Sequence, residues 1–349
     1  MAIRIKNNEK NLKAFRKIDP TQGARIYAQL MREITRAGIL ERDYAHYLFL
    51  SLFDLGGFFF FVYQFIIQNN PFALILCSFG IAFFTVRLGG LIHDAGHRAI
   101  FKSNLINDIY GFFCSFFIGF PFVVWQTKHN LHHGHTNEEG SDPDLEVPIS
   151  FTPEMLNRKG LAVRFMRKYQ AWLFYPLGAL VSYTFRLKAF RYYFENFSPK
   201  IFLAMCFHLI GMFIFYVLPF LVFPLWKALL FLLLVNELSG FHMLNVFAPN
   251  HKGMPQFEKG VRISFLERQI LSARNLYGHW LTDYVYLGLN YQIEHHLFPH
   301  CPRHKLKLIT PYILEICKKY KLAYTQMTVM ESNKFILSEL HKASKTIHP

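Results

Sequence analysis

The sequence predicts an all-α membrane protein, in which four transmembrane helices form two hairpins and a cytoplasmic helical cap holds a di-metal site. Composition, four long apolar stretches and three groups of histidines support this prediction. The 349 residues are 52% hydrophobic and 17% charged, with a mean hydropathy of +0.17. A soluble protein of this length would carry more charge. The composition therefore indicates a membrane protein with substantial aqueous parts.

Four apolar stretches have the length of about 20 residues that a bilayer-spanning helix needs. They run over about 47–67, 72–92, 201–220 and 226–246. Short uncharged turns separate the members of each pair, which predicts two hairpins. The chain is thereby divided into a basic N-terminal segment (1–44), a main domain (45–306) and a C-terminal tail (307–349).

Lysine and arginine counts predict the orientation of the spans, because cytoplasmic loops are enriched in both. Ten such residues precede the first span, whereas the two turns have none apart from Lys227, just inside the fourth span. Both turns should therefore face outward, and both ends and the middle segment should be cytoplasmic. The net charge of +15 is then explained by orientation and attraction to anionic lipid, without a nucleic-acid partner. Residues 1–44 also lack the apolar core of a signal peptide.

Two further stretches and a few polar residues also bear on the predicted membrane topology. Two weaker apolar stretches, 109–125 and 171–187, are interpreted as interfacial or re-entrant helices, with two further spans as the alternative. Three polar residues fall within the spans and are either functional or hydrogen-bonded between helices: Asp54, Asn236 and Glu237. Arg87 is expected to extend its charge to the membrane surface.

Seven of the 17 histidines fall in three tight groups. In the first two groups imidazoles recur three or four residues apart, on one face of a helix, and in the third His295 and His296 lie three and four residues after Gln292. The groups are His93 with His97, then His129, His132 and His133, and finally His295 with His296. Neutral imidazole is the commonest metal ligand among side chains. Because the predicted topology returns all three groups to the cytoplasmic side, we expect one shared polynuclear metal site.

The residue types in the groups favour iron. None is a cysteine, and the five cysteines form no CxxC pair, so a structural zinc site is disfavoured. Seven imidazoles exceed the ligands of one tetrahedral zinc and suit two ions with open positions, for which iron is the natural candidate. Nearby acids are interpreted as acceptors that orient imidazole N–H groups, with direct ligation as the alternative: Asp94, Asp142, Asp144 and Glu294. His135 is out of register with the second group, so we expect it behind the ligands.

At these residues the chain resembles the membrane fatty acid desaturases, over about 47–306. Residues 289–299 (LNYQIEHHLFP) and 248–255 (APNHKGMP) are the most specific segments. The resemblance implies a histidine-ligated di-iron centre that uses O2 and two electrons to remove two hydrogens from a fatty acyl chain. It also implies a hydrophobic substrate tunnel and a separate or fused electron donor.

The resemblance maps the seven histidines onto the family's three boxes and adds one histidine after the fourth span. We assign that place to His251, because His242 lies within the predicted helix. Gln292 stands where many members have histidine, as is typical of the front-end (Δ5/Δ6-like) type. Its amide can ligate directly, ligate through water, or only form hydrogen bonds. No catalytic residue is expected beyond the metal ligands.

The expected activity is O2-dependent desaturation of a long-chain fatty acyl group linked to coenzyme A or lipid. The chain lacks the His-Pro-Gly-Gly haem motif, so electrons are expected from a separate ferredoxin or cytochrome b5. An acyl hydroxylase or a Δ9-type desaturase with the same centre is the alternative within this chemistry. A zinc-dependent membrane hydrolase or receptor is the alternative of another class. The expected location is the bacterial inner membrane, with the endoplasmic reticulum second.

Overall fold

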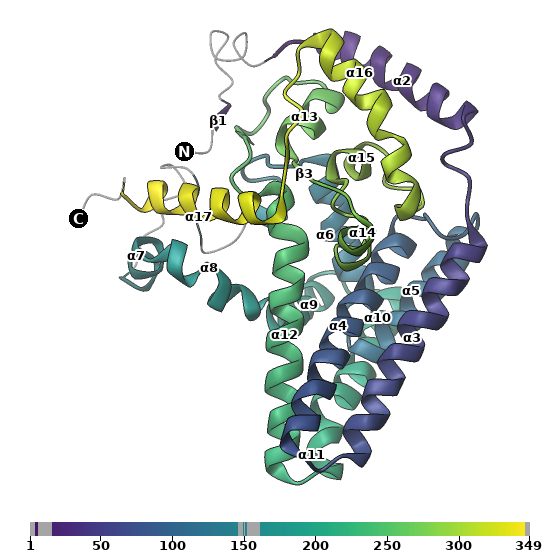
Figure 1. Ribbon diagram of the computed structural model, residues 1–349, viewed down its shortest axis with the longest axis vertical. Coiled ribbons are helices and arrows are strands. Elements are labelled where there is room, and N and C mark those ends of the chain that lie inside the picture. The colour runs from purple at the N-terminus through teal and green to yellow at the C-terminus, as the bar shows by residue number, and fades with distance from the viewer. Residues whose placement is uncertain (1–3, 6–15, 146–148, 150, 152–160, 346–349) are drawn as a thin grey trace. The chain divides into compact units, whose positions relative to one another are not determined.

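The computed structural model describes residues 4–5, 16–145, 149, 151 and 161–345. Helices make up nearly all of the regular structure (Figure 1). Two parallel strand pairs are present, β1 (Arg4–Ile5) with β2 (Gln256–Phe257) and β3 (Asn275–Leu276) with β4 (Gln326–Met327). The chain divides into two compact units. Unit 1 comprises Met1–Glu41, Lys128–Phe174 and Val246–Pro349, and unit 2 comprises Arg42–Thr127 and Tyr175–Asn245.

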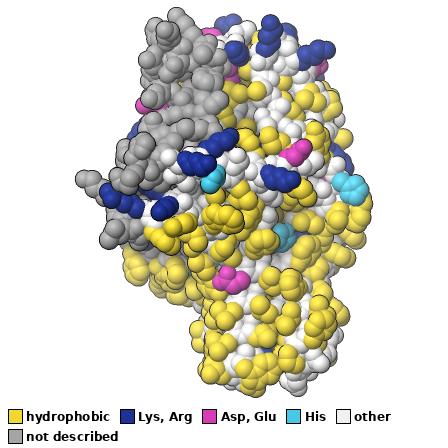
Figure 2. Space-filling view, turned by 60° about the vertical axis from the view of Figure 1, so that its left-hand side comes forward, with side chains coloured by type: hydrophobic (Ala, Val, Ile, Leu, Met, Phe, Trp, Pro, Cys, Tyr) yellow, Lys and Arg dark blue, Asp and Glu magenta, His cyan; other side chains and the backbone are white. Residues whose placement is uncertain are grey.

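Four helical segments in the described residues are long and apolar enough to cross a membrane, which confirms the number predicted from hydropathy. They are α3 (Tyr44–Ile67), α4 (Pro71–Gly96), the run Pro199–Val222, and α12 (Leu225–His251). The third consists of α10 (Pro199–Met212), a π-helical turn at Phe213–Val217 and α11 (Leu218–Val222). Hydrophobic side chains cover the part of the surface that these helices form in Figure 2, as lipid contact requires.

The weaker apolar stretch 109–125 is broken rather than straight. Helix α5 (Asn104–Ile118) and helix α6 (Phe122–Gly134) meet at an angle of 115°, typical of a broken span or a re-entrant loop. Gly119 lies between them with a positive φ of 56°, which glycine adopts without steric cost. Arg186 of α9 (Val181–Glu195) donates to the carbonyls of Ile118 and Gly119 at 2.7 and 3.0 Å. The buried carbonyls at the break are thus satisfied by a buried side chain.

Unit 2 contains a buried ion pair that overturns one prediction. Arg87 donates two hydrogen bonds of 3.1 Å to the carboxylate of Asp54, and both side chains are at most 1% exposed. The expectation that Arg87 extends to the membrane surface is therefore wrong, because a carboxylate on the neighbouring helix neutralises it. Asn236 follows the hydrogen-bonding alternative, since it accepts from the hydroxyl of Tyr216 at 2.6 Å.

Unit 1 has its own hydrophobic core, to which five helical segments contribute. These are α2 (Pro20–Arg36), α13 (Phe265–Ser272), α15 (Gln292–Leu297), the 3-10 helix η4 (Arg303–Leu308) and α16 (Thr310–Tyr320). The described residues of this unit also contain η1 (Pro143–Leu145), α7 (Leu161–Lys168), α14 (Trp280–Val285) and α17 (Val329–Lys345), together with the start of α8 (Gln170–Ala179) and the C-terminal ends of α6 and α12. This core contains Ile293 and Leu297 on either side of the third histidine group, so it holds that group in place.

Candidate metal centre

Six of the eight predicted ligands lie in unit 1, on three elements. His129, His132 and His133 occupy the last turns of α6, His251 is the last residue of α12, and His295 and His296 lie in α15. On α6, the Nε2 atoms of His129 and His133 are 3.2 Å apart, as expected for residues one helical turn apart. The ring of His133 lies 4.9 Å from that of His295 and 4.2 Å from that of His296, centroid to centroid.

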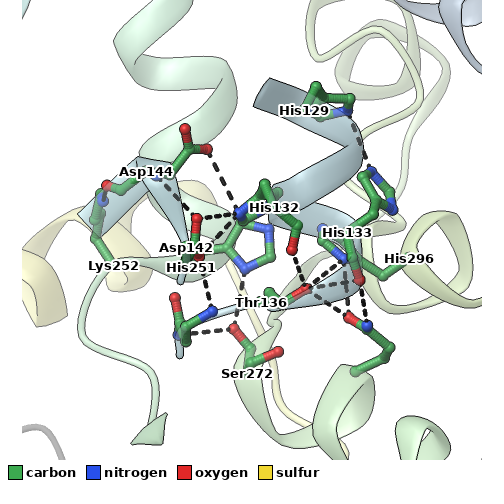
Figure 3. Close-up of polar contacts among 12 residues, drawn as sticks. His129, His132, His133, Thr136, Asp142, Asp144, His251, Lys252, Ser272 and His296 are labelled. Atoms are coloured by element: carbon green, nitrogen blue, oxygen red, sulfur yellow. Dashed lines mark hydrogen bonds and ion pairs between the residues drawn. The ribbon is translucent and has the colours of Figure 1, made fainter. Parts of the chain in front are cut away.

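Three of these imidazoles form a group that could hold a metal ion. Nitrogen atoms of His132, His251 and His296 all lie within 4.8 Å of one another. Their ring centroids are separated by 4.9 Å, 5.1 Å and 4.6 Å for the three pairs. The group takes one ligand from each of three separate helices, and Figure 3 shows the three rings together.

The outer contacts of the three rings fit a metal site. The Nδ1 atoms of His132, His251 and His296 lie 3.0 Å from an Asp142 carboxylate oxygen, the Ser272 carbonyl and the Gln269 amide oxygen, respectively. Metal-ligating histidines commonly donate their other ring N–H to such acceptors, which fixes ring orientation and tautomer. With Nδ1 as the donor in each ring, Nε2 is the atom left for a metal. This donor set fits a histidine-ligated iron.

Acidic residues concentrate around His132. Asp142 accepts from the backbone N–H of Asn137 at 2.8 Å, and Asp144 lies 3.6 Å from the Nδ1 of His132 (Figure 3). Burial acts to lower the pKa of His132, but the charges of Asp142 and Asp144 outweigh it and raise that pKa above its ordinary value. Burial opposes ionisation of Asp142 as well, yet His132 and two backbone N–H groups hold the pKa of this carboxyl below its usual range.

Gln292 lies beside this group. Its Nε2 is 2.9 Å from the Nε2 of His251, and its Oε1 accepts from the Asn250 amide at 3.0 Å. The side chain is buried. The Gln292 amide therefore contacts Nε2 of His251, the nitrogen that would face a metal. Gln292 is also the residue at which the third box differs from the form with three histidines.

The first histidine group lies in unit 2, at the C-terminal end of α4. The rings of His93 and His97 are 4.7 Å apart. The Nδ1 of His93 lies 3.1 Å from the carboxylate of Asp94, which in turn accepts from the hydroxyl of Tyr47 at 2.7 Å. Asp94 is thus positioned to accept a hydrogen bond from the Nδ1–H of the candidate ligand His93.

Other predicted residues take different places. His135 is exposed, and its Nδ1 lies 3.4 Å from Glu138. Glu294 does not orient an imidazole as expected, because its carboxylate accepts from Asn275 and Tyr324 in the core of unit 1. Burial raises the pKa of Glu294. His242 lies within α12 and stacks on Phe83, with ring centroids 5.4 Å apart.

Sequence reasoning missed the residues of α13 that contact the site. Gln269 and the carbonyl of Ser272 contact imidazoles, although no motif marks residues 265–272. A polar side chain on the apolar face of a short amphipathic helix is the only sequence signal at Gln269. A backbone carbonyl such as that of Ser272 leaves no signal at all.

Comparison with known proteins identifies the family. A family model described as fatty acid desaturase matches residues 69–328. The acyl-lipid (9-3)-desaturase of Physcomitrium patens is 29% identical over 276 residues, 74% of this chain and 51% of the relative. The acyl-lipid 8-desaturase of Rebecca salina is 30% identical over 256 residues, covering 70% and 57% of the two chains. The delta(5) fatty acid desaturase fat-4 of Caenorhabditis elegans is 30% identical over 258 residues, covering 68% and 56%.

The alignments thus span little more than half the length of these relatives. The family match, by contrast, covers most of this chain and includes all three histidine groups and His251. The chain therefore belongs to the fatty acid desaturase family.

Proposed function

We propose that this protein desaturates a long-chain fatty acyl substrate, linked to coenzyme A or to a lipid, at a histidine-ligated di-iron centre with O2 as co-substrate. The observation that carries the proposal is the group of His132, His251 and His296, whose Nδ1 atoms each face an acceptor while the rings converge. Bound iron would supply O2 activation and the oxidising power for hydrogen removal. The protein's part is to hold neutral imidazoles in one orientation in a buried site.

The proposed ligands of the two iron ions are the eight histidines that the sequence singled out: His93, His97, His129, His132, His133, His251, His295 and His296. Gln292 is a further candidate ligand, directly or through water, because its buried amide lies beside His251; its NH2 group faces the Nε2 of His251 and its oxygen accepts from Asn250, so ligation would require the amide to turn its oxygen toward the metal. Asp94 and Asp142 would orient His93 and His132 through Nδ1.

We propose front-end regioselectivity of the Δ5/Δ6 kind. Glutamine at position 292 supports this, as do the names of the relatives, which include a delta(5) fatty acid desaturase and a Delta(6)-fatty-acid desaturase, fat-3 of Caenorhabditis elegans. The substrate would lie in a hydrophobic tunnel, with the carbon to be oxidised beside the metal centre.

For the membrane arrangement we propose two hairpins with both turns outside and a cytoplasmic helical cap that carries the metal centre. The distribution of lysine and arginine supports it. Electrons would come from a ferredoxin or a cytochrome b5, attracted by the basic cytoplasmic surface. The bacterial inner membrane is our first hypothesis for the compartment and the endoplasmic reticulum the second; the eukaryotic origin of the relatives favours the second.

The test is expression in a host that lacks the activity, fed with linoleic acid, followed by gas chromatography of the fatty acid methyl esters. We expect a new double bond on the carboxyl side of the existing ones and about two irons per purified chain. His132→Ala and His296→Ala should abolish the product while the protein still inserts. His341→Ala, on the exposed face of α17, is the matched control and should retain activity.

Two outcomes would contradict the proposal. A hydroxy fatty acid in place of the alkene would assign the chain to the hydroxylase alternative. One zinc and no iron per chain would favour hydrolytic chemistry.

A further inference from the structure

Helix α13 contacts two of the three convergent imidazoles. One contact is made by the side chain of Gln269, and the other by the backbone carbonyl of Ser272, which is the last residue of this helix. The amide oxygen of Gln269 is 3.0 Å from the Nδ1 of His296, and the carbonyl of Ser272 is 3.0 Å from the Nδ1 of His251. A single short helix thus contacts the rings of His296 on α15 and His251 on α12 and fixes their orientation.

The side chain of Gln269 connects three elements. Its Nε2 donates to the backbone carbonyl of His133 at 2.8 Å, and its Oε1 accepts from the hydroxyl of Thr136 at 2.9 Å. The same oxygen faces His296. Gln269 is fully buried, as is Thr136. It therefore links the end of α6 to α15 through hydrogen bonds shielded from water.

These contacts allow only one orientation of the amide. A backbone carbonyl can only accept, so the NH2 group of Gln269 must face His133. The amide oxygen is then directed at His296, and an oxygen acceptor requires a proton on Nδ1. Nε2 of His296 is left with its lone pair, which is the form of the ring that binds a metal.

From this geometry we propose that Gln269 is a positioning residue of the metal centre, which selects the Nε2-ligating tautomer of His296 and joins α6 to α15. The proposal rests on the proposed iron site. It extends that site to a residue that is neither a histidine nor part of any box.

Helix α13 is itself firmly held. Ser264 caps its N-terminus by accepting from the backbone N–H of Glu267 at 3.2 Å, and the carboxylate of Glu267 accepts from the backbone N–H of Lys17 at 2.6 Å. Leu266 and Ile270 are buried in the core shared with α2, α15 and α16. The acceptors on α13 are therefore presented from a rigid element, as precise orientation of ligands requires.

The test compares Gln269→Leu and Gln269→Glu with the wild type and with Gln170→Leu. Gln170 is a matched control in the same unit, because it is also buried and donates to one backbone carbonyl, that of Leu340, at 2.9 Å. The measurements are iron release to a chromogenic Fe(II) chelator from the purified holoprotein, thermal unfolding, and kcat and KM for the acyl substrate.

We expect Gln269→Leu to release iron about 10–100-fold faster, the range typical for loss of a group that orients a metal ligand. Gln269→Glu retains an acceptor for His296 and should recover part of the iron retention, with kcat lowered and KM near that of the wild type. Gln170→Leu should lower the unfolding temperature without faster iron release.

Iron release from Gln269→Leu at the wild-type rate would overturn the inference. Equally fast iron release from Gln170→Leu would also overturn it, because the faster release would then follow from lower protein stability alone. If Gln269→Leu fails to fold, the rate of iron release from Gln269→Glu decides. Release as fast as from His132→Ala or His296→Ala overturns the inference, and a rate between those variants and the wild type supports it. A wild-type protein that holds no iron would instead refute the proposed function, and the inference with it.

Discussion

At the scale of single residues, the centre depends on acceptors behind the imidazoles. Asp142 illustrates this, because its carboxylate is buried and contacts His132 at 3.0 Å while also accepting backbone N–H groups from Asn137 and Asp144. A buried carboxylate of this kind is stable only when it is paired and hydrogen-bonded. The pair therefore contributes to the stability of the protein before any metal binds.

Asp142→Asn should have a pH-dependent cost in the metal-free protein. The raised pKa of His132 means that the pair stabilises fully below the ordinary histidine pKa of about 6.5 and loses this contribution as pH rises through the raised value. The lowered pKa of Asp142 means that the contribution is lost as pH falls below about 4. The drop in unfolding temperature caused by Asp142→Asn should thus be larger at pH 6 than at pH 9.

Asp144→Asn is the control for this prediction, because the Asp144 side chain is 55% exposed and solvent screens its charge. Its effect should be small at both pH values. Equal effects of Asp142→Asn at pH 6 and pH 9 would show that the ionic interaction with His132 contributes no stability.

The buried Asp54–Arg87 ion pair should matter for stability only while both partners are present. Removing one partner of a buried ion pair leaves an uncompensated charge, which typically costs about 3–5 kcal/mol, whereas removing both is often nearly neutral. Arg87→Leu should therefore lower the unfolding temperature in detergent strongly, and Asp54→Leu combined with Arg87→Leu should recover most of the loss. Asp54→Leu alone is measured as well. If the stability lost in the double variant equals the sum of the losses in Arg87→Leu and Asp54→Leu, the two side chains contribute independently and the prediction is wrong.

At the scale of elements, the N-terminal helix α2 belongs to the scaffold of the metal centre. Gly23 of α2 lies against Ser264, the cap of α13, so closely that a Cβ at this position would overlap the serine side chain. Tyr27 of α2 packs against Phe265 with ring centroids 5.2 Å apart. Because α13 orients His251 and His296, a displacement of α2 should reach the ligands.

Gly23→Val should therefore destabilise the protein by about 1–3 kcal/mol, the range for overpacking a tight contact, and accelerate iron release. The measurements are thermal unfolding and release of iron to a chelator. Ala24→Val, on the exposed side of the same helix, is the control; it should cost only the helix-propensity difference of about 0.5 kcal/mol and leave iron release unchanged. If Gly23→Val lowers stability but leaves the rate of iron release unchanged, the contact between α2 and α13 does not contribute to the orientation of the ligands.

At the scale of the whole molecule, the prediction concerns orientation in the membrane. The turn at 68–70 carries no charge, whereas lysine and arginine are numerous at both ends of the chain, so the positive-inside rule places the turn outside. A cysteine placed at Asn69, which is exposed, should react with an impermeant maleimide added to intact cells. A cysteine replacing the exposed Ser338 of α17 should react only after the cells are permeabilised. Labelling of both positions in intact cells would refute the proposed orientation.

The features that depend on local pattern could be predicted from the amino-acid sequence. Runs of apolar residues identify α3, α4, α10 to α11 and α12, because hydropathy alone decides whether a helix is stable in lipid. The end of α12 was underestimated, since apolar character stops at Val246 while backbone hydrogen bonding continues to His251. Imidazoles three or four residues apart marked the candidate ligands on α4 and α6, because helical periodicity is a property of the local chain, whereas His251 was assigned through the resemblance to a family.

The groups that contact these imidazoles from behind are set by tertiary packing. Asp142 orients His132, whereas Glu294, although adjacent to His295, bonds to Asn275 and Tyr324. Gln269 reaches His296 from 27 residues away in the chain, and Arg87 finds its partner on another helix. Such contacts depend on how distant segments pack, and proximity in sequence does not determine the direction of a side chain in the fold.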